Sequence, residues 1–204
     1  MDVITDKTTL SDLYGKPSER AILKQLDYID EHCAAFIKLS PFLIIGTMGK
    51  DGLGDVSPRG DAPGFVMVKD ERTLLLPDRL GNNRTDTLSN IIENKGVGLL
   101  FLVPGMNETL RVNGYARITV DAKVLENLSA QGKPPRSALQ VDVREAYLQC
   151  AKALIRSKLW DDNYKIERKS FPSLGQIIAD QMGRSEEGNA ADQSIKEGYR
   201  DKLY

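Results

Sequence analysis

The stretch Val97-Gly-Leu-Leu-Phe-Leu-Val-Pro-Gly-Met-Asn-Glu-Thr-Leu-Arg-Val-Asn-Gly114 decides the fold that we predict for this chain. Its first part, Val97 to Val103, is an apolar run of strand length, and a second strand is predicted from Thr109 to Val120. The segment between them holds Pro104 and Gly105, which are turn formers. The stretch therefore predicts a β-hairpin, the unit from which antiparallel sheets are built.

The residues before this hairpin predict further strands and one helix. The strands are expected at Phe42 to Thr47, up to Ser57-Pro58, at Phe65 to Lys69 and at Thr73 to Pro77. The helix begins near Asn83 or Arg84 and interrupts the series of strands once. Parallel βαβ units would alternate regularly instead, so the order of elements predicts an α+β fold with an antiparallel β-barrel or sandwich.

Helices are predicted on both sides of the strands. Apolar residues recur at three- and four-residue spacing from Pro17 to about Lys38, which predicts one amphipathic helix. After a last strand at Ala138 to Val141, Asp142 with Glu145 resembles a capping box. This box predicts a second helix that runs to about Leu159.

Composition excludes several classes of protein. The 204 residues carry 28 Lys and Arg against 29 Asp and Glu, whereas a dedicated nucleic-acid binder needs a basic face. No apolar run approaches the ~18 residues of a membrane span, and residues 1–20 lack the apolar core of a secretion signal. We expect a cytoplasmic protein with one domain over residues 1–182. A polar tail over residues 183–204 is expected to be disordered or to form an arm on a partner subunit.

Scarce thiols and imidazoles limit the chemistry that the side chains alone could supply. Cys33 and Cys150 are expected to be reduced thiols in the core, and His32, the single histidine, is expected at the surface or satisfied by a neighbour. No metal site is predicted, and no residue is an obvious general acid or base. An enzyme of this composition would depend on a bound cofactor.

Three segments have the character of binding elements. Ser57-Pro-Arg-Gly-Asp-Ala-Pro-Gly-Phe65 has an irregular backbone, and its alternative interpretation is a stiff turn with a solvated ion pair. In Leu76-Pro-Asp-Arg-Leu-Gly-Asn-Asn-Arg-Thr-Asp-Thr-Leu88 a strand leads into a helix start, where N–H groups and Arg84 would converge on a phosphate. A plain capped helix with a surface arginine is the alternative there. Glu108-Thr-Leu-Arg-Val-Asn-Gly114 alternates in polarity, as the lining of a pocket or a half-solvated strand would.

Together these segments resemble the pyridoxamine 5′-phosphate oxidase-like split β-barrels, and within them a subgroup regarded as FMN-dependent enzymes. The resemblance covers residues 10–182 and also includes Cys150-Ala-Lys-Ala-Leu-Ile-Arg-Ser157. It implies a mostly antiparallel split β-barrel with flanking helices. It further implies a homodimer with two FMN molecules in clefts at the subunit interface.

The same resemblance implies which residues hold the cofactor. The strand end after the hairpin meets the isoalloxazine ring through its backbone, and the loop and helix start that follow hold the phosphate. A strand residue of the third segment makes a further flavin contact, and an arginine near it is expected to stabilise negative charge on the reduced ring. The resemblance implies contacts of Pro77, Asp78 and Thr109 with the ring, and it places Asn83, Arg84 and Thr87 in the loop and helix start that hold the phosphate. On physical grounds we also expect Arg59 and Arg84 to bind the phosphate and Arg111 to act on the reduced ring.

Members of that family that make pyridoxal phosphate carry an Arg-x-His element for pyridoxamine phosphate near the C-terminus. This chain lacks that element. We therefore predict an FMN-dependent oxidoreductase that acts on a small organic substrate other than pyridoxamine phosphate. NAD(P)H or oxygen is the expected redox partner, and FAD is the alternative cofactor. The alternative functions are a non-catalytic carrier or sensor of flavin or haem with the same fold, and a structural dimer without a cofactor.

Overall fold

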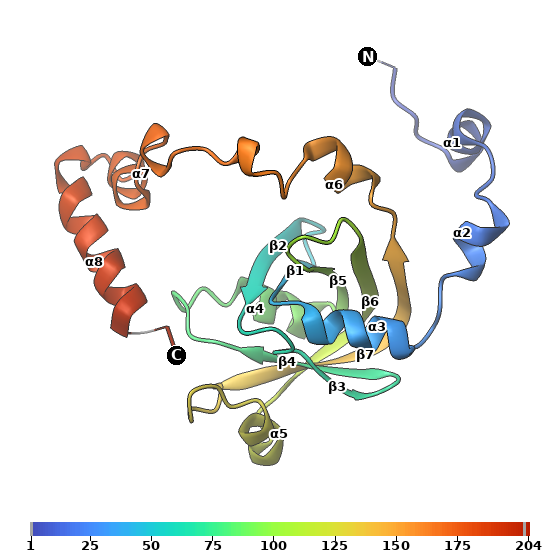
Figure 1. Cartoon of the computed structure of the whole chain (residues 1–204), viewed down its shortest axis with the longest axis horizontal. Helices are drawn as coiled ribbons and strands as arrows, with labels where there is room; N and C mark the ends of the chain where they lie inside the picture. The colour runs from blue at the N-terminus through green and yellow to red at the C-terminus, as the bar shows by residue number, and fades with distance from the viewer. Residues whose placement is uncertain (1, 202) are drawn as a thin grey trace.

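A seven-stranded antiparallel sheet in the order β2-β1-β5-β6-β7-β4-β3 forms the centre of the computed structural model, which describes residues 2–201 and 203–204. The sheet curls into a barrel that stays open, because β2 and β3 stand at its two ends (Figure 1). The predicted α+β fold with an antiparallel split barrel is confirmed. The strands are β1 (Phe42–Met48), β2 (Gly54–Gly60), β3 (Met67–Asp70), β4 (Thr73–Asp78), β5 (Gly96–Leu102), β6 (Thr109–Thr119) and β7 (Ser137–Gln149).

Helices surround the barrel and form an arm at each end of the chain. In Figure 1, α3 crosses the barrel, whereas α1–α2 and α6–α8 extend away from it on opposite sides. None of the described helices has the length and apolar character that crossing a membrane requires. The helices are α1 (Lys7–Tyr14), α2 (Glu19–Leu23), α3 (Glu31–Leu39), α4 (Asp86–Glu93), α5 (Ala122–Asn127), α6 (Lys152–Ser157), α7 (Leu174–Gln181) and α8 (Gly188–Asp201), with 3-10 turns at Asp162–Tyr164, Arg168–Ser170 and Ser185–Glu187.

The core lies between the inner faces of the strands and α3. Leu43 and Ile45 of β1 are fully buried, as are Leu99 and Phe101 of β5, so burial alternates along both strands. Each such side chain contributes roughly 1.5–3 kcal/mol by leaving water. The sequence alone shows only apolar runs of strand length here, and the structure adds which side chains face the core.

The single helix predicted from Pro17 to Lys38 is wrong, because the chain forms α2 and α3 separately. Between them, Leu26 pairs with Ala146 of β7 through two backbone hydrogen bonds of 3.0 and 2.8 Å. Asp30 then caps α3 by accepting a hydrogen bond from the Cys33 N–H at 2.8 Å. An exposed strand edge and a capping aspartate therefore outweigh the helical spacing of apolar residues.

The helix predicted from Asp142 to Leu159 is also wrong over most of its length, because β7 continues to Gln149. Strand β6 pairs with β7 from Ala138 to Gln149, whereas β4 pairs only with Ser137 to Asp142, so β6 holds the last part of β7 in the sheet. Glu145 does not cap a helix but accepts a hydrogen bond from Asn113 Nδ2 at 2.8 Å. The end of β7 also leaves Cys150 exposed, which corrects its predicted place in the core, whereas Cys33 is buried as predicted.

Candidate functional site

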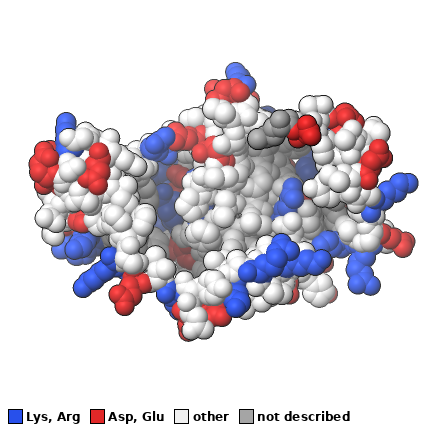
Figure 2. All heavy atoms as spheres, turned by 90° about the horizontal axis from the view of Figure 1, so that it is seen from above, with Lys and Arg blue, Asp and Glu red and all other residues white. Residues whose placement is uncertain are grey.

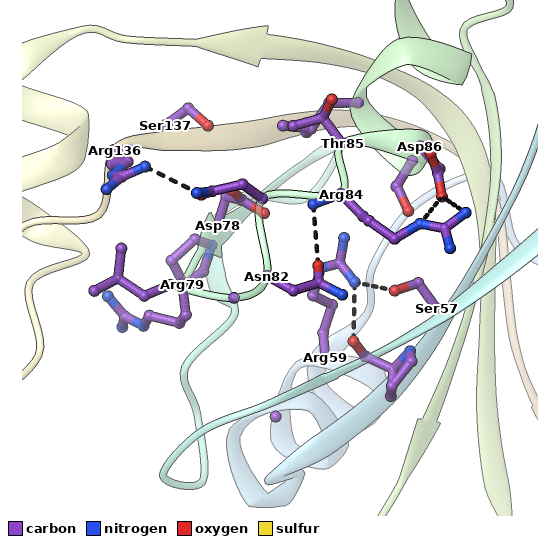
Figure 3. Close-up of a pocket in the computed structure, with 18 of the residues that line it drawn as sticks. Ser57, Arg59, Asp78, Arg79, Asn82, Arg84, Thr85, Asp86, Arg136 and Ser137 are labelled. Carbon is purple, nitrogen blue, oxygen red and sulfur yellow. Dashed lines mark hydrogen bonds and ion pairs between the residues drawn. The ribbon is translucent and has the colours of Figure 1, made fainter. Parts of the chain in front are cut away.

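A cavity of about 690 Å³ opens where β2, the end of β4 and the start of α4 meet, and its volume is typical of small-molecule pockets. Ser137, the first residue of β7, and Arg136 just before it add to its wall (Figure 3). Six of the eight residues that the sequence predicted as cofactor contacts line it, namely Arg59, Pro77, Asp78, Asn83, Arg84 and Thr87. The chain fold thus brings two of the three predicted binding segments together.

Arg59 reaches the cavity from β2. Because β2 stands at the end of the sheet, it can contain Pro58, whose missing N–H would disrupt a central strand. The Arg59 guanidinium donates through Nη1 to Ser57 Oγ and, at 2.9 Å, to the Pro58 carbonyl oxygen. It forms no ion pair with any carboxylate in the described part of the chain, so its charge is available to a ligand.

The loop between β4 and α4 makes hydrogen bonds within itself and with Arg136, which precedes β7. Asn83 has a φ of +58°, in the left-handed region that asparagine tolerates better than most residues. Its Oδ1 accepts a hydrogen bond from Arg136 Nη1 at 3.3 Å, and Asn82 Oδ1 accepts one from the Arg84 N–H at 3.0 Å. Sequence reasoning missed Arg136, because it follows two prolines in a segment without periodicity or motif.

Helix α4 begins at Asp86, slightly later than predicted, and its start faces the cavity. Its N-cap residue, Thr85, makes no side-chain capping bond, so this side chain leaves the N–H groups of the first turn without a cap. These groups and the positive end of the helix dipole favour an anion. Arg84 is directed to Asp86 instead, with Nε at 3.0 Å and Nη2 at 2.9 Å from Oδ2 (Figure 3). Its side chain is 76% exposed, so this ion pair is worth only about 0–1 kcal/mol.

Asp78 lies at the end of β4 between two cavity arginines. Burial raises the pKa of this carboxyl, and the charges of Arg59 and Arg136 act in the opposite direction. No described residue donates a hydrogen bond to its carboxylate. The charges of Arg59 and Arg136 therefore both act on the half-buried Asp78. Arg84, in contrast, forms an ion pair with Asp86.

Thr87 lines the cavity but is buried, and its hydroxyl lies 3.5 Å from the Asp55 carboxylate. A carboxylate at that position opposes a phosphate nearby. Thr87 and Ile91 take the inner positions of this helix, whereas Ile92 is exposed.

Thr109 and Arg111 do not line the cavity. Thr109 is buried at the start of β6, where it pairs with Gln149 of β7. Arg111 is exposed, and its guanidinium carbon lies 5.8 Å from the centre of the Tyr147 ring. Within one copy of the chain these two predicted contacts are therefore separate from the other six.

A comparison with protein families decides what kind of protein carries this cavity. The family model described as pyridoxamine 5′-phosphate oxidase matches residues 29–150, which include all the strands. The chain belongs to this family. The match ends before the C-terminal arm, so α6, α7 and α8 lie outside it.

Solved structures with the pyridoxamine 5′-phosphate oxidase fold resemble the barrel at low sequence identity. A variant of HupZ from Group A Streptococcus has a TM-score of 0.50 and 14% identity, over 59% of this chain and 99% of that chain. General Stress Protein 26 from Bacillus anthracis has a TM-score of 0.43 and 13% identity, over 57% and 93%. The FAD binding protein from Mycobacterium smegmatis has a TM-score of 0.44 and 18% identity, over 61% and 97%. No curated protein matches the sequence.

Proposed function

We propose that this chain is a flavin-dependent oxidoreductase that binds FMN in the cavity between β2, β4 and α4. The observation that carries the proposal is the convergence of six predicted contacts on one cavity that also contains Arg136. Membership of the pyridoxamine 5′-phosphate oxidase family supports the same function. The proposed substrate is a small organic molecule, with NAD(P)H or oxygen as the redox partner.

The phosphate of FMN would lie at the start of α4. Arg59 and the N–H groups of the first helical turn offer donors there, and Arg84 can join them after leaving Asp86. Leaving an exposed ion pair costs about 0–1 kcal/mol, whereas a hydrogen bond to a charged group contributes about 1.5–3 kcal/mol. The exchange therefore favours the phosphate.

The ring of FMN would lie along the end of β4, where it would contact the backbone of Pro77 and Asp78. Bound FMN supplies hydride and electron transfer, which no side chain of this cavity supplies. The chain would orient the ring and exclude water from it. Burial raises the pKa of Asp78, so this carboxyl is the cavity's candidate for holding a proton beside the substrate.

A homodimer would complete the site, with Thr109 and Arg111 contributed by the second copy. The outer surface of β1 and β2 supports such an association, because large apolar side chains are exposed there. Figure 2 shows charges of both signs on the two terminal arms and fewer charges between them. The exposed apolar residues of the two strands are Phe42, Ile44, Met48 and Val56.

Titration of the flavin-free protein with FMN, FAD and riboflavin tests the cofactor. Riboflavin lacks the phosphate, so it should bind more weakly than FMN if Arg59 and the start of α4 hold that group. Equal affinity for FMN and riboflavin would contradict the phosphate site. Failure to bind any of the three would contradict the function altogether.

Turnover separates an oxidoreductase from a carrier. The FMN-loaded protein should oxidise NADH or NADPH, or transfer electrons from its reduced flavin to oxygen, repeatedly rather than once. A single stoichiometric reduction without turnover would favour the carrier. A haem carrier has less support, because His32 is 74% exposed on α3 and does not line the cavity.

A further inference from the structure

Asp61 follows β2, and its side chain, which carries the carboxylate, is only 4% exposed. An ionised carboxylate that leaves water needs donors to replace its hydration. It has three: Arg79 Nε at 2.6 Å, the Ala62 N–H at 2.7 Å and the Tyr204 hydroxyl at 2.7 Å. Burial by itself raises the pKa of Asp61, but the hydrogen bonds from Tyr204, Ala62 and Arg79 hold it below the usual value. The carboxylate is therefore ionised at neutral pH.

Arg79 connects this carboxylate to the proposed FMN cavity. Its side chain is 17% exposed and forms part of the cavity wall (Figure 3). Nε donates to Asp61, and Nη1 donates to the Leu128 carbonyl oxygen at 2.8 Å. A planar guanidinium held at two points has a fixed orientation. Asp61 therefore determines where one positive charge of the cavity wall lies.

Tyr204 is the last residue of the sequence, yet it contacts residues of the barrel. Its hydroxyl donates to Asp61 Oδ1, and its backbone oxygen accepts a hydrogen bond from Lys133 Nζ at 3.0 Å. The arm that precedes it packs mainly on itself, because α7 and α8 contact each other far more than they contact the barrel. In Figure 1 the chain end returns from α8 toward the barrel. Tyr204 thus ties the C-terminal arm to the cavity wall.

We infer that Tyr204 is a positioning residue of the FMN site: its hydroxyl completes the donor shell of Asp61 and thereby keeps the Arg79 guanidinium in the cavity wall. The inference rests on the proposed function, because it assigns the consequence to FMN binding. Tyr204 itself does not line the cavity, so it acts through the other two residues.

Docking of Tyr204 and binding of FMN are thermodynamically linked, so each should affect the other. If the docked chain end favours FMN, then FMN favours the docked chain end by the same factor. Couplings between sites are commonly about 5–150-fold, and the loss of one hydrogen bond corresponds to the low end of that range, about fivefold.

FMN titration of three full-length proteins tests the role of the hydroxyl: the wild type, Tyr204→Phe and the control Tyr199→Phe. Tyr204→Phe removes one oxygen and keeps the ring, whereas Tyr199 is an exposed residue of α8 that does not line the FMN cavity. We expect Tyr204→Phe to weaken FMN binding about fivefold and Tyr199→Phe to leave it unchanged. Thermal unfolding without flavin checks that all three proteins are folded.

A double-mutant cycle separates positioning from a general loss of structure. The background is Asp61→Asn with Arg79→Gln, which removes both charges of the buried pair and leaves neither of them uncompensated. In that background Tyr204→Phe should no longer change FMN affinity. A fivefold loss that persists there would overturn the inference, because Tyr204 would then act by another route.

The remaining outcomes distinguish this inference from the proposed function. If the wild type binds FMN and Tyr204→Phe binds it equally well, the positioning role is wrong and the FMN site stands. If the wild type binds no flavin, both are wrong. A loss of FMN affinity in Tyr204→Phe that disappears in the double-mutant background would support both.

Discussion

Replacing Arg59 by alanine should weaken FMN binding through the phosphate alone. The Arg59 guanidinium has no ion pair among the described carboxylates, so a phosphate would gain its interaction without displacing one. A hydrogen bond to a charged group contributes about 1.5–3 kcal/mol, which corresponds to a roughly 10- to 150-fold increase in the FMN dissociation constant. Fluorescence titration of the flavin-free protein measures that constant. Riboflavin affinity should stay unchanged, since riboflavin has no phosphate.

The matched control is Arg72→Ala, because Arg72 is an exposed arginine of the β3–β4 hairpin that pairs with Asp27 outside the cavity. It should leave both affinities as they are. Equal losses of FMN and riboflavin affinity in Arg59→Ala would mean that Arg59 does not meet the phosphate. An unchanged FMN affinity would refute the assignment of this corner as the phosphate site.

Three further predictions concern the cavity and the sheet. Arg84→Ala should weaken FMN binding less than Arg59→Ala does. Asp86→Asn should tighten FMN binding by up to about fivefold in the same titration, because this substitution frees Arg84 from an ion pair of at most about 1 kcal/mol. Burial raises the folded-state pKa of Asp78, so the free energy of unfolding should rise as pH falls through that pKa. Asp78→Asn should therefore be more stable than the wild type at neutral pH. Urea denaturation at several pH values should show that this difference in stability vanishes in acid. A Cβ at Gly114 would clash with a backbone carbonyl of β7, so Gly114→Ala should lose about 1–3 kcal/mol of stability, whereas the control Gly54→Ala meets open space and should change it little, as measured by thermal or chemical unfolding.

The central strands were predictable because their apolar runs have strand length and turn residues flank them. In β1, the sequence shows a continuous apolar run from Phe42 to Ile45 of strand length, and the structure shows which side chains, Leu43 and Ile45, face the core. The second half of β7 was not predictable, because Asp142 and Glu145 carry a local helix signal. Pairing with β6 and with Leu26 decides its structure, and those partners are distant in sequence.

The candidate site divides in the same way. The segments around Arg59 and Arg84 were recognisable, because proline, glycine and asparagine mark loops whatever the fold around them. The pairing of Arg84 with Asp86 depends on side-chain orientation, which no spacing reveals. Arg136 and Tyr204 reach the cavity wall or its support only through tertiary contacts. Sequence patterns therefore locate the cavity and leave its charge arrangement to the structure.

The open ends of this barrel have a consequence for how the protein resists aggregation. A strand at the end of a sheet offers unpaired backbone groups to which strands of other molecules can add. Pro58 interrupts that row of donors in β2, while β3 is short, charged at Lys69 and Asp70, and irregular in register between Val68 and Asp70. The proline-containing strand that places Arg59 in the cavity wall thus also protects one exposed edge of the sheet. Ligand binding would therefore constrain Arg59, and resistance to fibre growth would constrain its neighbour Pro58.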